Sequence, residues 1–489
     1  MGFGSSKQSP VDCCCRAKKL SPEELRQKFV AAGQGHVFKF IDEGKVSAED
    51  QEKFLDELQG LDLDYISKSY ASAMAEAASG GNSAELAPPT DFATLAGSSR
   101  EDIAMWERVG LEAVGRGEVA ACVLAGGQGT RLGFDGPKGC YNMGLPSGKP
   151  LFQLMCEKIV CLKSRAREAG GTASRVPFLV MTSPINHTET EEFFRTNNYF
   201  GLPSADVWFF MQGTLPCLTK EGKIILESSC TLATAPDGNG GIYPALNKSG
   251  CLDKLKAAGV KYLHVFSVDN ALSRPADPRF AGFCISRNAD CGNKCVWKVS
   301  PDEAVGVVAK RDGRYSVVEY SELSRERKDM RDESGKLVFG AGNICNHFFS
   351  LAFIADVVVP SMATMFHLAN KKIPCAGDDG KTVKPESNNG IKLESFIFDV
   401  FPMSERMAIL ETDRAEEFAP VKNAPGAATD SPDTARAMVS ALAQRWVTDS
   451  GGKVIGSKGV LEISPLVSFA GEGLKDKVEG NTYDLNASA

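Results

Sequence analysis

The sequence predicts an α/β protein in which a mostly parallel sheet is covered by helices on both faces. Short apolar runs alternate with stretches of helical or turn-rich sequence, which is typical of strands joined by crossover helices. The runs are apolar throughout, as expected for strands buried on both faces. Ligands of such sheets bind beyond the carboxyl ends of the strands, so the residues after each run are the candidates for a site. The runs span residues 119–125, 176–181, 207–211, 262–268 and 305–308.

Helical signals fill the region before the first apolar run. Ser21 with Glu24 three residues later has the pattern of a capping box, and Ser47 and Ser99 also precede apolar residues at helical spacing. After about residue 406 the pattern changes, and residues 454–468 alternate as β structure does. The sequence therefore predicts four segments. They are a disordered tail (1–20), a helical N-terminal domain (21–115), an α/β domain (116–405) and a small β-rich domain (406–489).

Composition excludes several classes of protein. The chain has 489 residues, 43% of them hydrophobic, which is enough to build a core without disulfides. Its net charge of −7 argues against bulk affinity for nucleic acid. No apolar window is long enough to span a membrane, and no secretory signal opens the chain. The fifteen cysteines form no CxxC pair. This pattern predicts reduced thiols in a cytoplasmic protein, with no structural zinc.

A glycine-rich segment follows the first apolar run and reads LAGGQGTRLG, with Pro137-Lys138-Gly139 shortly after it. Glycines after a strand let backbone N–H groups approach a phosphate closely. The segment fits neither a Walker A loop nor a dinucleotide fingerprint. A plain tight turn is the alternative interpretation. Arg131 and Lys138 favour the phosphate site, because two cations beside one glycine loop serve a polyphosphate well.

Further polar residues follow other apolar runs. Asp269 ends the run at 262–268, where a carboxylate is a natural Mg²⁺ ligand, although a loop or cap aspartate is the alternative. Asn239 lies in the turn-forming segment APDGNGG, which is either a ligand loop or a surface turn. Glu319 and Asn343 are candidates for binding sugar hydroxyls or for structural hydrogen bonds. His347 is predicted to support the core rather than to catalyse.

These segments together resemble the eukaryotic UDP-N-acetylhexosamine pyrophosphorylases, also called UDP-N-acetylglucosamine pyrophosphorylases. The resemblance runs from about Ser21 to Leu474. It implies a doubly wound nucleotidyltransferase core of the GT-A or Rossmann-like type, a helical N-terminal part and a small C-terminal domain resembling a β-helix. The motifs in chain order are LAGGQGTRLG, PKG, FFMQG, APDGNGG, VDN, VVEYSE, AGNICNH, NGIKLESFIFD, VKNAPG and EISPLVSFAGEGL.

The resemblance also implies roles for single residues. Arg131 and Lys138 are the expected catalytic cations, and Asp269 is the expected ligand of Mg²⁺ or Mn²⁺. The residues expected to bind UTP are Leu124, Ala125, Gly126, Gly127, Gln212, Gly238, Lys392 and Lys422. The residues expected to bind the sugar are Asn239, Gly306, Glu319, Tyr320 and Asn343.

The implied reaction joins UTP to N-acetylglucosamine 1-phosphate, with its galactosamine epimer as a further candidate substrate, and releases pyrophosphate. It needs no protein nucleophile, because the sugar phosphate supplies the attacking oxygen. Positioning and charge stabilisation should therefore carry catalysis. Two alternatives remain at this level: a UDP-glucose or UDP-sugar pyrophosphorylase, and a regulator that binds UDP-sugars without catalysis.

The extreme N-terminus lies outside the resemblance. Gly2 followed by Ser6 fits the N-myristoylation pattern, and Cys13, Cys14 and Cys15 are candidate palmitoylation sites. Two lipid signals are what stable membrane anchoring requires. The sequence thus predicts a cytoplasmic enzyme with a candidate membrane anchor, and an unmodified tail is the alternative.

Overall fold

The computed structural model describes residues 19–78, 85–172 and 175–486. Its chain divides into two compact units, each assembled from segments that are distant in sequence. These units differ from the four consecutive segments predicted above, because contacts between distant segments, rather than sequence order, hold each unit together. The first unit contains Met1–Met74, Leu215–Ala235 and Leu368–Leu393, and the second contains Ala75–Thr214, Pro236–His367 and Glu394–Ala489.

The first unit contains the helices predicted at the N-terminus. Ser21 caps the first helix in a capping box with Glu24, and Ser47 caps α3, as predicted. Later segments pack directly against these helices. The side chain of Gln34 donates to the Gly222 carbonyl and accepts from the Ile224 N–H. The helices are α1 (Pro22–Ala31), α2 (Lys39–Asp42), α3 (Ala48–Gln59) and α4 (Leu63–Ala78), of which α4 continues into the second unit.

Short strands complete this region of the chain. They form two-stranded sheets that pair β7 with β8, β16 with β17 and β15 with β18. Their bounds are β7 (Leu226–Ser228), β8 (Thr231–Leu232), β15 (His367–Lys371), β16 (Cys375–Ala376), β17 (Thr382–Val383) and β18 (Gly390–Glu394).

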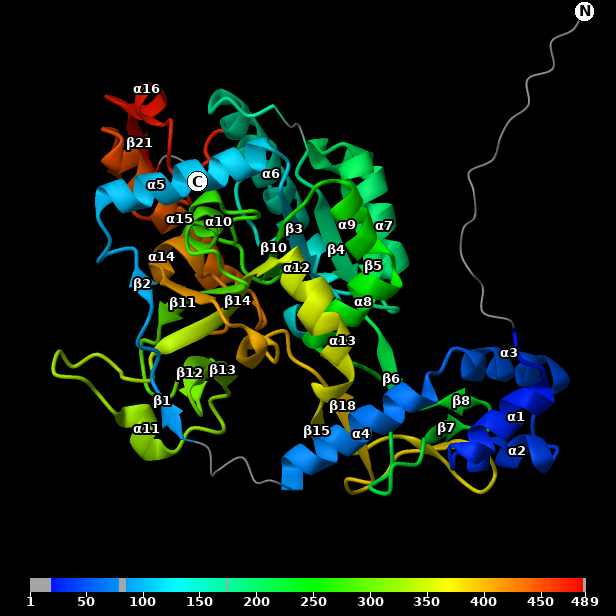
Figure 1. Ribbon diagram of the computed structural model, residues 1–489. Coiled ribbons are helices and arrows are strands. Elements are labelled where there is room, and N and C mark those ends of the chain that lie inside the picture. Colours follow the sequence, from blue (N-terminus) through cyan, green and yellow to red (C-terminus); the bar gives the residue numbers. More distant parts are fainter. Residues whose placement is uncertain (1–18, 79–84, 173–174, 487–489) are drawn as a thin grey trace, which may run out of the picture. The chain divides into compact units, whose positions relative to one another are not determined.

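The second unit is built on an 11-stranded mixed sheet with the order β2-β19-β11-β14-β10-β3-β4-β5 (Figure 1). Four neighbouring strands, β10, β3, β4 and β5, are parallel, as the apolar runs predicted. β14 runs antiparallel to both β10 and β11. The strands are β1 (Leu86–Ala87), β2 (Ala93–Thr94), β3 (Val119–Leu124), β4 (Phe178–Thr182), β5 (Val207–Met211), β10 (Tyr262–Ser267), β11 (Cys291–Trp297), β12 (Val307–Arg311), β13 (Arg314–Val318), β14 (Ala341–Ser350) and β19 (Met407–Glu411).

Helices cover both faces of this sheet, so the core is doubly wound. Alternate residues of β3 point to opposite faces. Ala121 and Val123 pack in one apolar cluster with α5, α6 and α7, while Ala120 and Cys122 pack in another with α8 and α9. The helices are α5 (Arg100–Gly115), capped by Ser99 as predicted, α6 (Leu151–Glu168), α7 (His187–Thr196), α8 (Ile242–Lys248), α9 (Cys251–Ala257) and α10 (Pro278–Ser286).

The segments that carry the glycine-rich loop and Asp269 meet at one edge of the sheet. The parallel strands β3, β4, β5 and β10 all end there. Because β14 runs in the opposite direction, its first residues lie at this same edge, beyond the pairing of Phe266 with Asn346. The topology therefore brings the loop after β3, the loop after β10 and the start of β14 to one side of the molecule.

The region after residue 406 differs from the predicted β-rich domain. Its longest element is the helix α15 (Pro432–Asp449), and β19 belongs to the main sheet. Within residues 454–468, regular strand structure is confined to the end of β20 (Lys453–Ile455), which pairs in parallel with β21 (Thr482–Asp484). Alternating apolar residues there fill contacts with α15 rather than a sheet face. The β-helix-like arrangement stays a prediction from the resemblance.

The predicted acylation sites lie outside the described residues, so the structure does not test them. Among the residues that the structure describes, no helix has the length and apolar character needed to cross a membrane. The twelve cysteines of this part of the chain are all free, in agreement with the predicted reduced thiols.

Candidate functional site

The glycine-rich loop after β3 is held by side chains from the neighbouring strand end. Asn186 donates to the Ala125 carbonyl at 2.9 Å, and the Ser183 hydroxyl donates to the Gly126 carbonyl at 2.8 Å. The Lys138 N–H closes the loop on the Gly127 carbonyl at 3.2 Å. Ser183 and Asn186 were missed by the sequence analysis. They follow β4, so the rule of inspecting residues after each strand could have found them.

Three cations gather beside this loop. Burial lowers the pKa of Lys138, the carboxylate of Asp269 opposes that shift, and the positive charges of Lys422 and Arg131 add to it. These effects place Asp269, Lys422 and Arg131 within electrostatic range of Lys138. In the described part of the chain, none of the three cations forms an ion pair. Such a surplus of unpaired positive charge favours a polyanionic ligand.

Asp269 lies just beyond the end of β10, and hydrogen bonds hold both its side chain and its backbone. The Ser267 hydroxyl donates to its Oδ1 at 2.7 Å, and its carbonyl accepts from the Val421 N–H at 2.8 Å. Among the described residues, no group of three or more His, Cys, Asp or Glu side chains is arranged to hold a metal. Magnesium commonly binds through one or two carboxylates and completes its coordination with water and substrate phosphates. A single carboxylate would be enough for that ion if a phosphate ligand bound beside it.

Gln212 directly follows β5 and lies against the glycine loop. A Cβ atom on Gly126 would approach Gln212 Oε1 to 2.8 Å, so this glycine permits the close contact. Gly238 has φ +88°, and a Cβ there would lie 2.2 Å from the Ser395 carbonyl oxygen. The Oδ1 atom of Asn239 accepts from the Ile397 N–H at 2.9 Å, which leaves its NH₂ group for a ligand. The loop at 236–241 is therefore a tightly packed support rather than a plain surface turn.

Three of the five predicted sugar-binding residues, Gly306, Glu319 and Asn343, are neighbours in the structure. The Asn343 N–H donates to the Gly306 carbonyl at 2.8 Å. A Cβ on Gly306 would lie 3.0 Å from Glu319 Oε1, so these three residues are neighbours. Burial raises the pKa of the Glu319 carboxyl, and the charge of Glu322 raises it further. Tyr320 follows Glu319 and is exposed.

Lys392 and His347 differ from the residues above in the part of the fold to which they belong. Lys392 lies in β18 of the first unit, whereas the other predicted site residues belong to the second unit, so its role in binding UTP stays a prediction. His347 is fully buried between Phe349 and Phe401. Burial, and then His264, lower the pKa of His347 to about 3, as suits a neutral core histidine.

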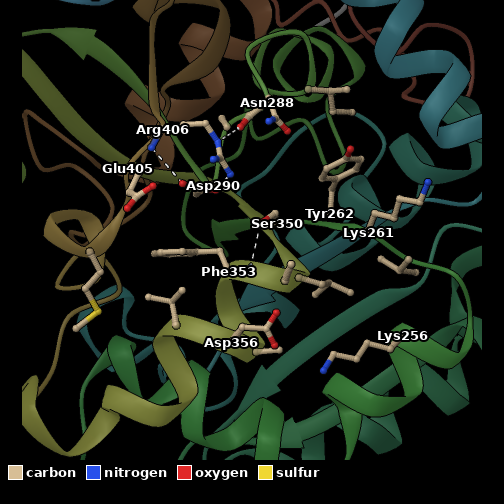
Figure 2. A pocket seen from close by; sticks show the side chains of 18 of the residues that line it. Lys256, Lys261, Tyr262, Asn288, Asp290, Ser350, Phe353, Asp356, Glu405 and Arg406 are labelled. Atoms are coloured by element: carbon tan, nitrogen blue, oxygen red, sulfur yellow. Dashed lines mark hydrogen bonds and ion pairs between the residues drawn. The ribbon is translucent and has the colours of Figure 1, made fainter.

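A cavity of about 990 Å³ lies at the opposite edge of the sheet (Figure 2). It is lined by Tyr262, where β10 begins, and by Ser350, where β14 ends. Figure 2 shows Arg406 directed at Asp290 and at the Asn288 carbonyl, so these groups are engaged with one another. This cavity contains none of the predicted site residues and is separate from the candidate site.

Known proteins resemble this chain over most of its length. The family model described as UTP–glucose-1-phosphate uridylyltransferase matches residues 100–478. The chain is 41% identical to UDP-N-acetylhexosamine pyrophosphorylase-like protein 1 of Xenopus tropicalis, covering 93% of this chain and 94% of the relative. It is 40% identical to UDP-N-acetylglucosamine diphosphorylase 2 of Arabidopsis thaliana, covering 95% and 93%. The crystal structure of the Trypanosoma brucei uridine diphosphate N-acetylglucosamine pyrophosphorylase with an inhibitor matches with a TM-score of 0.80 and 33% identity, covering 92% and 93%.

Proposed function

This chain belongs to the UTP–glucose-1-phosphate uridylyltransferase family, and we propose that it joins UTP to an N-acetylhexosamine 1-phosphate and releases pyrophosphate. The observation that carries the proposal is that Arg131, Lys422 and Asp269 all act electrostatically on Lys138, beside the glycine-rich loop that its N–H closes. Glu319 and Asn343, which both lie against Gly306, supply polar groups suited to a sugar. The names of the relatives, which specify N-acetylated hexosamines, support the choice of sugar.

The chain's own groups account for catalysis by positioning and charge. Two polyanions must meet with the sugar phosphate oxygen in line with the bond that breaks at the α-phosphate of UTP. Arg131 and Lys138 offset the negative charge of the triphosphate and of the departing pyrophosphate. Backbone groups of the glycine loop, fixed by Ser183 and Asn186, hold the phosphates without the need for reorganisation.

We assign Asp269 as the protein ligand of a divalent cation, Mg²⁺ or Mn²⁺. When bound, the ion supplies Lewis-acid stabilisation of phosphate oxygens. The Ser267 hydroxyl orients the Asp269 carboxylate, and the N–H of Val421 holds its backbone. Lys422 follows Val421 in the chain, so the same hydrogen bond supports a role for Lys422 close to Asp269.

The deciding experiment is a single-turnover assay of the full chain with UTP, Mg²⁺ and one of three sugar 1-phosphates. We expect pyrophosphate release with N-acetylglucosamine 1-phosphate or N-acetylgalactosamine 1-phosphate, and much slower release with glucose 1-phosphate. Equal rates with glucose 1-phosphate would assign the chain to the UDP-sugar alternative. Binding of UTP without turnover of any sugar would instead leave it as a regulator.

For the tail, we infer N-myristoylation at Gly2 supported by acylation at Cys13, Cys14 or Cys15, on the strength of two adjacent lipidation signals. Mass spectrometry of the N-terminus from native cells tests this directly. The Gly2→Ala variant should stay wholly out of the membrane fraction. A wild-type chain that does the same and has an unacylated N-terminus would refute the inference.

A further inference from the structure

Two segments that carry phosphate-binding residues are hydrogen-bonded to each other. Asn270 donates to the Glu417 carbonyl at 2.7 Å and accepts from the Ala419 N–H at 2.9 Å. The Val421 N–H donates to the Asp269 carbonyl at 2.8 Å. Since Lys422 is the next residue, this pairing sets where its backbone lies relative to Asp269.

A buried ion network lies behind these paired segments. The Lys294 ammonium contacts Asp277 and Glu417, each at 2.5 Å, and Arg274 contacts Glu417 at 3.2 Å and Glu416 at 2.9 Å. The side chains of Lys294 and Glu417 are 0% and 2% exposed. We use the name ion network for these five residues.

The network connects both segments to strand β11 of the main sheet. Lys294 lies on β11, Arg274 and Asp277 follow the segment of Asp269, and Glu417 begins the segment of Lys422. The turn after Asp269 is also held from α6, where Lys158 donates to the Ser273 carbonyl at 2.7 Å. The backbone next to the metal ligand is therefore fixed by directional contacts on two sides.

Stability alone does not explain such a network. Taking charges out of water is costly, and apolar residues of similar volume often stabilise a core as well or better. Hydrogen bonds between ions do supply something that apolar packing lacks, namely a fixed direction and distance. Supporting residues of this kind tune metal and phosphate sites through the groups they orient.

We propose that the ion network positions the phosphate site by holding the segment of Lys422 in register with that of Asp269. Its members are positioning residues that act through those two side chains. The inference rests on the proposed function in one respect only, which is that the ligand carries a triphosphate. Disturbing the network should therefore weaken recognition of the β- and γ-phosphates and leave the nucleoside half of the site intact.

The test is calorimetric binding of UTP and of UMP to the full chain in Mg²⁺. The double variant K294M/E417Q removes one positive and one negative charge together, so it leaves no new excess charge in the core. We expect its UTP affinity to fall about 10- to 100-fold, the range found for residues that orient metal ligands. Its UMP affinity should change by about twofold or less, as for a substitution away from a binding site.

The matched control is K149M/E157Q, which removes another largely buried ion pair (Lys149 Nζ to Glu157 Oε2, 2.7 Å) that contacts neither paired segment among the described residues. It should bind both nucleotides as wild type does. A cooperatively folded K294M/E417Q with an unchanged ratio of UTP to UMP affinity would overturn the proposal.

A second variant keeps the test decisive if the double variant does not fold. Arg274→Lys preserves the charge but cannot contact Glu416 and Glu417 together as a guanidinium does, and the same affinity ratio decides the outcome. Because the readout is binding, it is separate from the reaction. Wild-type protein that binds UTP but turns over no sugar phosphate would refute the proposed function. The ratio of UTP to UMP affinity in the variants would still test the role of the ion network.

Discussion

Lys138 shows how charged side chains of the candidate site affect one another. Lys138 is partly buried beside two other cations, and its charged form is supported mainly by Asp269. A charge held ready in this way costs no reorganisation when a polyanion arrives. Local charge therefore matters more here than the net charge of −7 for the whole chain.

Arg131→Ala and Lys138→Ala should each lower kcat by roughly 10²–10³, the loss found on removing one preorganised charge donor. Steady-state kinetics with UTP and N-acetylglucosamine 1-phosphate measures the effect. Lys256→Ala, at the opposite edge of the sheet, is the control and should retain wild-type turnover. Normal turnover in both site variants would contradict the proposal that Arg131 and Lys138 stabilise the charge of the phosphates.

Glu319→Gln should impair use of the sugar phosphate and spare UTP. The half-buried carboxylate faces Gly306 and Asn343, and a buried polar group left without its partner costs roughly 1–3 kcal/mol. The KM for the sugar phosphate should rise about tenfold, as each 1.4 kcal/mol gives. Glu326→Gln, on an exposed helix nearby, serves as the control. A raised KM for UTP alone would mean that the two half-sites are assigned the wrong way round.

Lys158 should make stability depend on pH. Burial, and then Arg274, lower the pKa of this lysine to about 7, so the unfolded chain binds more protons than the folded chain above that pH. The unfolding free energy should therefore rise with pH through this group, and the advantage of wild type over Lys158→Met should grow by roughly 2 kcal/mol from about pH 7 to about pH 9. Denaturant unfolding at several pH values measures this, and a flat difference would contradict it.

At the scale of elements, helices α5 and α10 show how closely the second unit is packed. A Cβ on Gly110 of α5 would lie 1.7 Å from the Pro278 carbonyl oxygen, and one on Gly282 of α10 would lie 1.7 Å from that of Trp106. The two helices therefore meet backbone to backbone. This contact also fixes the start of α10, which Asp277 caps while it pairs with Lys294.

Gly110→Ala should destabilise the protein by about 3 kcal/mol, because overpacking of a rigid contact costs typically 1–3 kcal/mol and this contact is between backbones. Gly60→Ala, at the end of α3, meets only an ordinary contact at 3.4 Å and should change stability by roughly 0.5 kcal/mol or less. Equilibrium unfolding in urea compares the two. Equal stability of both variants would show that the helices separate easily.

For the whole molecule, ligand binding and folding are linked. A ligand that binds only the folded chain adds about 2.7 kcal/mol to the unfolding free energy at one hundred times its Kd. UTP with Mg²⁺ should therefore raise the melting temperature more than UTP with a chelator. In Asp269→Asn the effect of Mg²⁺ should be largely lost while that of UTP alone persists. An unchanged Mg²⁺ effect in the variant would place the metal elsewhere.

Much of the second unit was predictable because its signals are local. Buried runs, serine caps and turn glycines each act within a few residues, and the structure confirms the predicted strands and the caps at Ser21, Ser47 and Ser99. The helix α15 carries equally local signals, Ser431 with Thr434 and a proline at its first position, which the β-rich interpretation overlooked.

The sequence by itself thus determined the alternation of strands and helices, the glycine-rich loop and the chemical types of the site residues. Only the tertiary structure decided which of them meet: the support of the loop by Ser183 and Asn186, the pairing of the Asp269 segment with that of Lys422, and the ion network behind them. The same holds for the first unit, which joins three distant stretches of chain. Such contacts depend on packing across the whole fold, and no periodicity or spacing within a short window records which distant residue becomes a neighbour.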